Sequence, residues 1–370
     1  MRLAFISNHP APYRDPFLNR LCRLLGADAD VYSLFPSDTG HQFWALEPHE
    51  YKEVILGDVS KSRVLLLVKL MRKFLISKYD LMCFPGFLGW YMPIFLFILA
   101  VFRRRYIICA DTVEQRDVSK LALWVKRYVI RHASCLFVPG IASRKFFETC
   151  FNVNQDRIIM GAYALDGPAI ERKIESLRQE KSRVRNRMGI ADDAKVFLMV
   201  ANMLPNRHYP ITSEAFAKFS ENHKECYFVM VGRGPELEKM KMVAEKKNAL
   251  KVIPGCSFSE MLELYAAADV YVHGGKEPAS TALVIGAIAK LPLISSSAVG
   301  CFADVVKDGV SGYDVNDYLS VQAWKETFER AYSEQSQWID MGKAARVLSL
   351  DLDVDNCVKR FIEKISDLTK

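Results

Sequence analysis

The sequence predicts an α/β protein made of two doubly wound, Rossmann-like parallel-sheet domains that face each other across a central cleft. A chain of 370 residues is longer than one ordinary hydrophobic core requires, which favours two domains. Short β-rich runs alternate with longer helical runs in both halves, and this order is typical of parallel sheets covered by helices. A polar helical stretch without a strand, over 165–190, separates the two series and is interpreted as the linker.

The first domain is expected over residues 1–164. Its predicted strands cover 2–7, 29–34, 81–84, 106–110 and 134–138, and its predicted helices cover 15–25, 62–77, 93–103, 121–132 and 142–150. An amphipathic helix over 354–368 is expected to cross back, so that residues 354–370 join this domain.

The second domain is expected over residues 165–350. It opens with an almost continuous apolar run that is typical of a strand buried on both faces. Its predicted strands cover 195–201, 227–231, 250–253, 270–272 and 291–295, with helices over 211–219, 236–246, 258–267 and 280–289.

Positive charge is concentrated in the first domain. Residues 1–164 hold 22 Lys and Arg against 14 Asp and Glu, a net +8, whereas the rest holds 28 against 29, a net −1. Basic clusters lie beside apolar runs at Lys61, Arg63, Lys69, Arg72 and Lys73, and at Arg103, Arg104 and Arg105. This combination predicts peripheral contact with an anionic membrane, and a solvated basic face is the alternative. No basic stripe with interleaved aromatic residues is present, so no nucleic-acid partner is expected.

The most apolar run, over 87–102, is interpreted as a buried crossover helix. It spans about 16 residues, fewer than the roughly 20 that cross a bilayer, and Gly89 and Pro93 interrupt it. Residues 1–6 are expected to form a strand and not a signal peptide, and the nine scattered cysteines indicate reduced thiols. A cytoplasmic location, peripheral on the inner face of the cell membrane, is therefore expected.

An ordered set of motifs occupies the second domain. They are VANMLPNR over 200–207, VGRGPEL over 231–237, PG over 254–255, ELYAAADVYV over 263–272, EPAS over 277–280, AKLPLI over 289–294, VG over 299–300 and KDGVSG over 307–312. In this order the stretch over roughly 195–315 resembles glycosyltransferase family 4, with a weaker match at SNHPAPYR over 7–14. The resemblance implies the GT-B fold and a retaining, nucleotide-sugar-dependent glycosyltransferase.

The resemblance also implies a donor, an acceptor and no metal cofactor. The donor is expected to be a UDP-sugar, and the acceptor a glycan or lipid-linked glycan in bacterial surface polysaccharide synthesis. Two Asp-x-Asp stretches, over 28–30 and 351–355, are interpreted as turn or capping residues and not as metal ligands. A sugar-nucleotide epimerase or phosphorylase on the same fold remains an alternative, as does a catalytically silent, membrane-associated assembly subunit.

Two residues are predicted to carry the chemistry. Arg207 follows a strand end, where the family has a lysine on the diphosphate, and an arginine keeps the charge and adds bidentate geometry. Glu277 matches the first glutamate of the family's Glu-x7-Glu pair, which contacts the donor sugar. Ser280 opens a helix whose first N–H groups favour a diphosphate. The predicted donor-binding set is Asn202, Cys256 (through its main chain), Pro278, Ala279, Ser280, Thr281 and Ile285.

Three differences from the family pattern involve four positions. Ile285 stands where the family has the second glutamate, which holds the ribose, so ribose recognition must differ. Asn202 replaces an arginine and removes one positive charge from the diphosphate site. Ala279 and Ser280 replace the usual phenylalanine and glycine.

Three residues of the first domain are predicted to face the acceptor or the cleft. Tyr13 and Arg14 belong to the first strand-to-helix turn, in which Asp15 is a candidate N-cap. Asp111 follows a strand end, and a helix-cap role is the alternative for it. His273 follows a buried strand and is interpreted as more often structural than ligand-binding.

Overall fold

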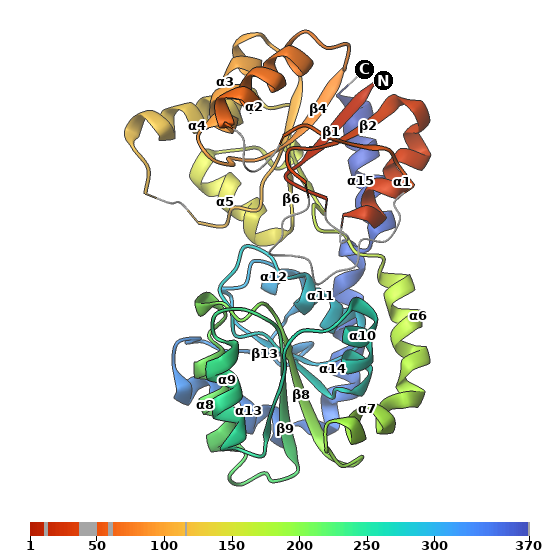
Figure 1. Ribbon diagram of the computed structural model, residues 1–370, viewed down its shortest axis with the longest axis vertical. Helices are drawn as coiled ribbons and strands as arrows, with labels where there is room; N and C mark the ends of the chain where they lie inside the picture. The colour runs from red at the N-terminus through yellow and green to blue at the C-terminus, as the bar shows by residue number, and fades with distance from the viewer. Residues whose placement is uncertain (11–13, 37–49, 58–61, 115–116, 369–370) are drawn as a thin grey trace. The chain divides into compact units, whose positions relative to one another are not determined.

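The computed structural model describes residues 1–370 except 11–13, 37–49, 58–61, 115–116 and 369–370. The chain divides into two compact units (Figure 1). Unit 1 comprises residues 1–165 and 352–370, and unit 2 comprises residues 166–351. The first expected boundary lies one residue from the observed one, and the expected return at 354 lies two residues from it.

Unit 1 contains a seven-stranded, wholly parallel sheet in the order β3-β2-β1-β4-β5-β6-β7. The strands are β1 (Leu3–Ser7), β2 (Ala29–Ser33), β3 (Glu53–Ile55), β4 (Leu81–Pro85), β5 (Tyr106–Cys109), β6 (Cys135–Val138) and β7 (Ile158–Met160). The sequence did not predict β3 and β7, because each is a three-residue strand at an edge of the sheet and no long apolar run marks it.

Helices cover both faces of this sheet. They are α1 (Asp15–Leu25), α2 (Arg63–Leu70), α3 (Tyr91–Val101), α4 (Lys120–His132), α5 (Ile141–Phe151) and α15 (Val354–Asp367). Alternate residues of β1 point to opposite faces of the sheet, so they belong to two different hydrophobic cores. Leu3 and Phe5 pack with residues of α1 and α15, whereas Ala4 and Ile6 pack with residues of α2 to α5.

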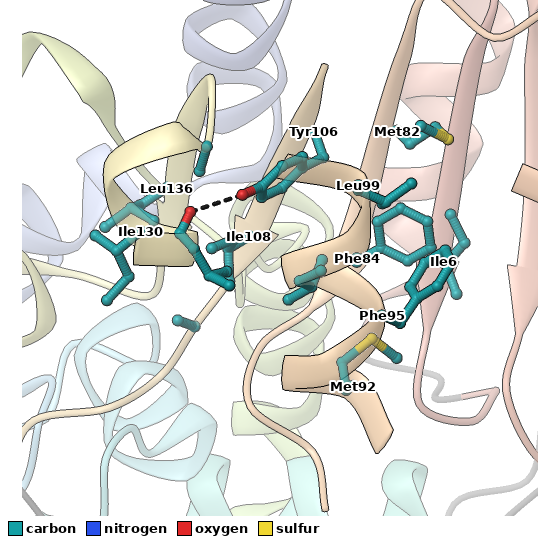
Figure 2. Packing of buried hydrophobic residues seen from close by; sticks show 14 of the residues in the cluster. Ile6, Met82, Phe84, Met92, Phe95, Leu99, Tyr106, Ile108, Ile130 and Leu136 are labelled. Carbon is teal, nitrogen blue, oxygen red and sulfur yellow. Dashed lines mark hydrogen bonds between the residues drawn. The ribbon is translucent and has the colours of Figure 1, made fainter. Parts of the chain in front are cut away.

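The apolar helix α3 packs against the sheet, as the sequence predicted. Met92, Phe95 and Leu99 are fully buried, and the Phe95 ring meets Phe84 of β4 edge-on at 5.2 Å between centroids (Figure 2). Across the same core the Tyr106 hydroxyl donates to the carbonyl oxygen of Val129 at 2.7 Å. Within the described parts of the chain, no helix has both the length and the apolarity that a membrane span requires.

Unit 2 contains a six-stranded parallel sheet in the order β10-β9-β8-β11-β12-β13. The strands are β8 (Lys195–Val200), β9 (Cys226–Val231), β10 (Leu250–Ile253), β11 (Val270–Val272), β12 (Leu293–Ser295) and β13 (Gly312–Asp314). The helices are α6 (Gly167–Leu177), α7 (Lys181–Arg187), α8 (Tyr209–Phe219), α9 (Leu237–Glu245), α10 (Phe258–Ala267), α11 (Thr281–Ile288), α12 (Phe302–Val305), α13 (Val321–Ser333) and α14 (Trp338–Ser349).

A buried arginine attaches α7 to the amino-terminal ends of two strands. Arg185 is 1 % exposed, and its five N–H groups donate to the carbonyl oxygens of Ala267, Asp192 and Ala194 and to the Asp269 carboxylate. Asp269 in turn accepts from the backbone N–H of Val196 at 2.8 Å. Every donor of this guanidinium is therefore paired, as a buried charge requires.

Candidate functional site

The loops that follow β8, β11 and β12 meet at the carboxyl edge of the unit 2 sheet, which is where parallel α/β sheets bind ligands. Asn206 and Lys276 join the first two loops, since Lys276 N–H donates to Asn206 O at 2.8 Å and the Asn206 side chain donates to Lys276 O at 2.9 Å. Glu277 forms a β-bridge with Val299, and Gly300 N–H donates to Glu277 O at 2.8 Å. The backbone of Glu277 is thus held by both neighbouring loops.

Two glycines allow these loops to approach closely. A Cβ at Gly300 would lie 1.6 Å from the carbonyl oxygen of Pro278, so no other residue fits there. A Cβ at Gly275 would lie 2.8 Å from Cδ of Arg207. The missing side chain at Gly275 therefore lets the arginine lie against the β11 loop.

The Glu277 carboxylate lies between an arginine and a histidine side chain. Its Oε2 is 2.5 Å from NH2 of Arg207, and its Oε1 is 2.6 Å from Nε2 of His273. The side chains of Glu277 and Arg207 are 12 % and 14 % exposed, and that of His273 is 0 % exposed. Burial raises the pKa of Glu277, but His273, Arg207 and Ser280 outweigh it, so the net pKa is lowered. Glu277 is therefore charged at neutral pH.

Arg207 does not use all of its hydrogen-bond donors. NH1 donates to the carbonyl oxygen of Lys276 at 3.2 Å, and NH2 pairs with Glu277. Nε is buried and has no hydrogen-bond partner among the described residues. A guanidinium with an unused donor at the carboxyl ends of strands suits an anionic ligand such as a phosphate.

The amino terminus of α11 lies directly after Glu277 in the chain. Ser280 is its N-cap, and the Ser280 side chain accepts from the backbone N–H of Leu283 at 3.3 Å. The Cys301 thiol fixes Ser280 from the β12 loop, since Sγ accepts from Ser280 N–H and contacts Ser280 O, both at 3.3 Å. Burial raises the pKa of this thiol, which keeps it neutral. The positive end of the α11 dipole thus lies next to the Arg207–Glu277 pair.

Only some of the predicted donor-binding residues lie near Glu277. Pro278, Ala279, Ser280 and Thr281 connect Glu277 to α11, and Asn202 is half-buried in the loop that follows β8. Cys256 follows β10 at the edge of the sheet, three strands from β11, and no contact between described residues joins it to Glu277. Burial raises the pKa of Cys256 to about 11.

The prediction for Ile285 needs correction. Ile285 lies inside α11 and is 1 % exposed, packed in the interior of unit 2. A buried aliphatic side chain has no atom that could hold a ribose hydroxyl. We therefore assign Ile285 to the core and not to the donor-binding surface.

The structure adds His273 to the site. Its position after a buried strand predicted a structural role, yet its ring contacts the carboxylate of Glu277, four residues further along the chain. A signal existed in the sequence, because a histidine directly after a buried strand and four residues before the predicted catalytic glutamate lies at the same strand end. The contact itself depends on the loop conformation, which the sequence does not reveal.

The candidates in unit 1 form no comparable cluster among the described residues. Tyr13 lies outside the described residues. Arg14 precedes α1, where it occupies the N-cap position in place of the expected Asp15, which instead accepts a hydrogen bond from Tyr51 OH at 2.7 Å. Asp111 is exposed beyond the end of β5 and accepts from Tyr163 OH at 3.0 Å, and no helix begins at it.

A bound metal ion would require several ligating side chains that lie close together. Among them, no group of three or more His, Cys, Asp or Glu side chains is arranged to hold a metal ion. The first Asp-x-Asp stretch supplies a hydrogen bond from Tyr79 OH to Asp30 at 2.6 Å, and Asp353 of the second is the residue before α15. Metal-independence stays a prediction.

Unit 2 is similar in sequence to known glycosyltransferases. Residues 180–348 match the family described as glycosyl transferases group 1. A lipopolysaccharide 1,2-N-acetylglucosaminetransferase of Salmonella typhimurium is 23 % identical over 201 residues, which cover 51 % of this chain and 53 % of that protein. An alpha-monoglucosyldiacylglycerol synthase of Acholeplasma laidlawii is 25 % identical over 142 residues, which cover 37 % of this chain and 35 % of that synthase. The matches thus span about half of the first relative and about a third of the second.

Solved structures match over the whole chain. Anabaena HepE in complex with UDP has a TM-score of 0.76 at 17 % identity, with 99 % of this chain and 100 % of that chain covered. A glycosyltransferase from Rickettsia africae has a TM-score of 0.77 at 12 % identity, with 100 % and 99 % covered. The fold is therefore GT-B, as predicted, and the family match together with the named relatives supports an enzyme of glycosyl transfer.

Proposed function

We propose that this protein is a retaining glycosyltransferase that moves a sugar from a UDP-sugar to a glycan or lipid-linked acceptor during synthesis of a bacterial surface polysaccharide. The relatives named for lipopolysaccharide and glycolipid transfer support the acceptor class, and the neighbours solved with UDP and UDP-glucose support the donor class. The proposal places the enzyme in the cytoplasm and requires no metal. Transfer that persists in excess EDTA would support the last point, and its loss would contradict it.

The proposed mechanism assigns one task to each charged group of the site. Arg207 binds the diphosphate and stabilises the negative charge that develops as the glycosidic bond to the leaving group breaks. Glu277 accepts hydrogen bonds from hydroxyl groups of the donor sugar. The amino terminus of α11 adds the positive end of its dipole on the diphosphate side. The departing diphosphate oxygen takes the proton of the acceptor hydroxyl, so no protein base is needed.

The observation that carries the proposal is the partly unsatisfied guanidinium of Arg207 beside Glu277. Its test is thermal unfolding of the wild type with UDP, GDP, CMP or dTDP, because a ligand that binds the native state stabilises it. We expect UDP alone to raise the melting temperature, and Arg207→Ala to abolish the rise while the fold is retained. Transfer by Arg207→Ala should fall by roughly 10² to 10³-fold, as when one charge-stabilising donor is removed.

The opposite result would favour the catalytically silent relative. The burial of Ile285 in α11 supports that alternative, because it leaves the helix without the carboxylate that holds the ribose in the family. A silent subunit should bind none of the four nucleotides. Turnover of the nucleotide sugar without any acceptor would instead identify an epimerase.

We propose further that unit 1 contacts an anionic membrane through α2, α3 and α4, of which α3 packs against both of the others (Figure 1). Large exposed apolar side chains lie on these helices or directly at their ends, namely Val64, Leu65, Trp90, Ile94, Phe102, Leu121 and Trp124. The exposed cations Lys69, Arg72, Lys73, Arg103 and Arg105 accompany them. Apolar side chains between cations match the interface of an anionic bilayer.

Sedimentation with vesicles of anionic or neutral lipid tests this surface. The wild type should sediment with the anionic vesicles, and Leu121→Ser combined with Trp124→Ser should reduce the bound fraction. Met242→Ser is a matched control, because Met242 is 60 % exposed on unit 2 and should leave sedimentation unchanged. Equal binding to both kinds of vesicle, or none, would contradict the proposal.

A further inference from the structure

Arg207 faces two competing tasks at the site. Its NH2 lies 2.5 Å from Glu277 Oε2 in the structure, and a bound diphosphate would need the same guanidinium. If Arg207 turned to the diphosphate and Glu277 had no other partner, a carboxylate that is only 12 % exposed would be left unpaired. Leaving a buried charge without a partner is strongly unfavourable and would oppose binding.

His273 offers Glu277 a second partner. The ring is 0 % exposed, and its Nε2 lies 2.6 Å from Glu277 Oε1. Nε2 has no other hydrogen-bond partner among the described residues, so the Glu277 carboxylate is the polar group that it meets. Because no part of the His273 side chain reaches solvent, it cannot itself touch a ligand.

The surroundings of His273 hold the ring in place. Its backbone N–H donates to Ile294 O at 2.8 Å, and its carbonyl oxygen accepts from Ser295 Oγ at 3.2 Å, which ties it to β12. Its Nδ1 lies 3.4 Å from the Tyr271 hydroxyl, whose proton is donated to Val200 O at 3.1 Å. Nδ1 thus meets the Tyr271 hydroxyl, and Nε2 is the ring nitrogen that faces the Glu277 carboxylate.

We infer that His273 is a positioning residue, which keeps the Glu277 carboxylate paired while Arg207 turns from Glu277 to the diphosphate of the nucleotide sugar. The inference rests on the proposed function of the same site. It assigns the two oxygens of Glu277 different partners: Oε1 stays with His273 throughout, and Oε2 is released by Arg207 to meet the donor sugar. Binding of the donor then exchanges one partner of the carboxylate and does not strip it of both.

The test uses UDP, which lacks the sugar and so does not need Glu277, with binding measured by titration calorimetry. We expect His273→Phe to weaken UDP binding about tenfold or more, because residues in direct contact couple strongly. Glu277→Gln should relieve this loss, since a buried neutral amide costs far less to leave without a partner than a buried carboxylate. The double variant should therefore bind UDP within about threefold of Glu277→Gln alone, a rescue that a packing defect would not give.

The matched control is a second histidine–glutamate pair in the same unit. His223 Nε2 lies 2.7 Å from Glu329 Oε2, and the ring stacks on Phe219. His223→Phe should alter stability and leave the affinity for UDP unchanged. If His273→Phe does not fold, His273→Leu takes its place, because leucine also removes both ring nitrogens.

Two outcomes separate the inference from the proposed function. A wild type that binds UDP, with effects of His273 and Glu277 variants that simply add, overturns the role of His273 and leaves the proposed function intact. A wild type that binds no nucleotide overturns the proposed function, and the inference with it. Weakening by His273→Phe that Glu277→Gln relieves supports both.

Discussion

Two arginine–carboxylate pairs of unit 2 contrast sharply in how completely they are bonded. Arg185 uses all five of its N–H groups, on three backbone carbonyls and on the Asp269 carboxylate. Arg207 uses one carbonyl and one carboxylate, and its buried Nε has no partner among the described residues. The first guanidinium is saturated, whereas the second is not.

The two pairs occupy opposite ends of the same two strands. Ala194 and Asp269 directly precede β8 and β11, whereas Arg207 and Glu277 belong to the loops that follow these strands. In a parallel α/β sheet the carboxyl ends of the strands bind ligands. The saturated pair therefore holds the fold together, and the unsaturated pair is available to a ligand.

The largest expected effect that tests this contrast is on stability, in Arg185→Ala. Removing this guanidinium leaves three carbonyls and a carboxylate short of donors, and we expect the free energy of unfolding to fall by roughly 3 to 5 kcal/mol. Urea unfolding measures the loss. Arg185→Lys should recover only part of it, because lysine has three donors in place of five. A loss below about 1 kcal/mol would refute the structural role of the pair.

Gly275→Ala should affect binding more than folding. The new Cβ would lie 2.8 Å from Cδ of Arg207 and push this side chain from its place. We expect UDP affinity to fall roughly tenfold, equivalent to about 1.4 kcal/mol, measured by calorimetry. The same change in an Arg207→Ala background should have no further effect on binding. A further loss in that background would mean that the methyl group acts through another residue.

The dependence of stability on pH should separate Glu277 from the other carboxylates. Because its folded-state pKa lies below the ordinary value of 4.5, its charge stabilises the fold at neutral pH, and this contribution disappears as the pH falls through the folded-state value. The stability advantage of the wild type over Glu277→Gln should be constant between about pH 7 and pH 5 and shrink towards about pH 3.5. An advantage that grows in acid would contradict the lowered pKa.

The smallest effect is expected for Lys181→Ala. Lys181 Nζ lies 2.8 Å from Asp269 Oδ1, but its side chain is 37 % exposed. An ion pair that solvent screens contributes little, so we expect a loss of about 0.5 kcal/mol in urea unfolding, with UDP affinity unchanged. A loss as large as that of Arg185→Ala would show that burial does not distinguish the two partners of Asp269.

The sequence predicted the parts of this site better than their contacts. Apolar runs and turn residues were enough to predict the principal strands, and the ordered motifs placed Arg207 and Glu277 after β8 and β11. The strands β3, β7 and β13 were missed because each is a three-residue strand at the edge of its sheet, where no long apolar run marks it. Ile285 was misassigned because its position in the motif suggested a ligand, whereas only the packing of α11 reveals that it is buried.

The return of α15 to unit 1 has a consequence for synthesis on the ribosome. Val354, Cys357 and Phe361 of this helix complete the core over Leu3 and Phe5 of β1, a strand that is made before the whole of unit 2. Unit 2 is one continuous stretch and can complete its core while α15 is still leaving the ribosome. Unit 1 is started before unit 2 and is completed after it, with one face of its sheet uncovered until α15 emerges. For that interval, this apolar face of unit 1 is exposed to chaperones.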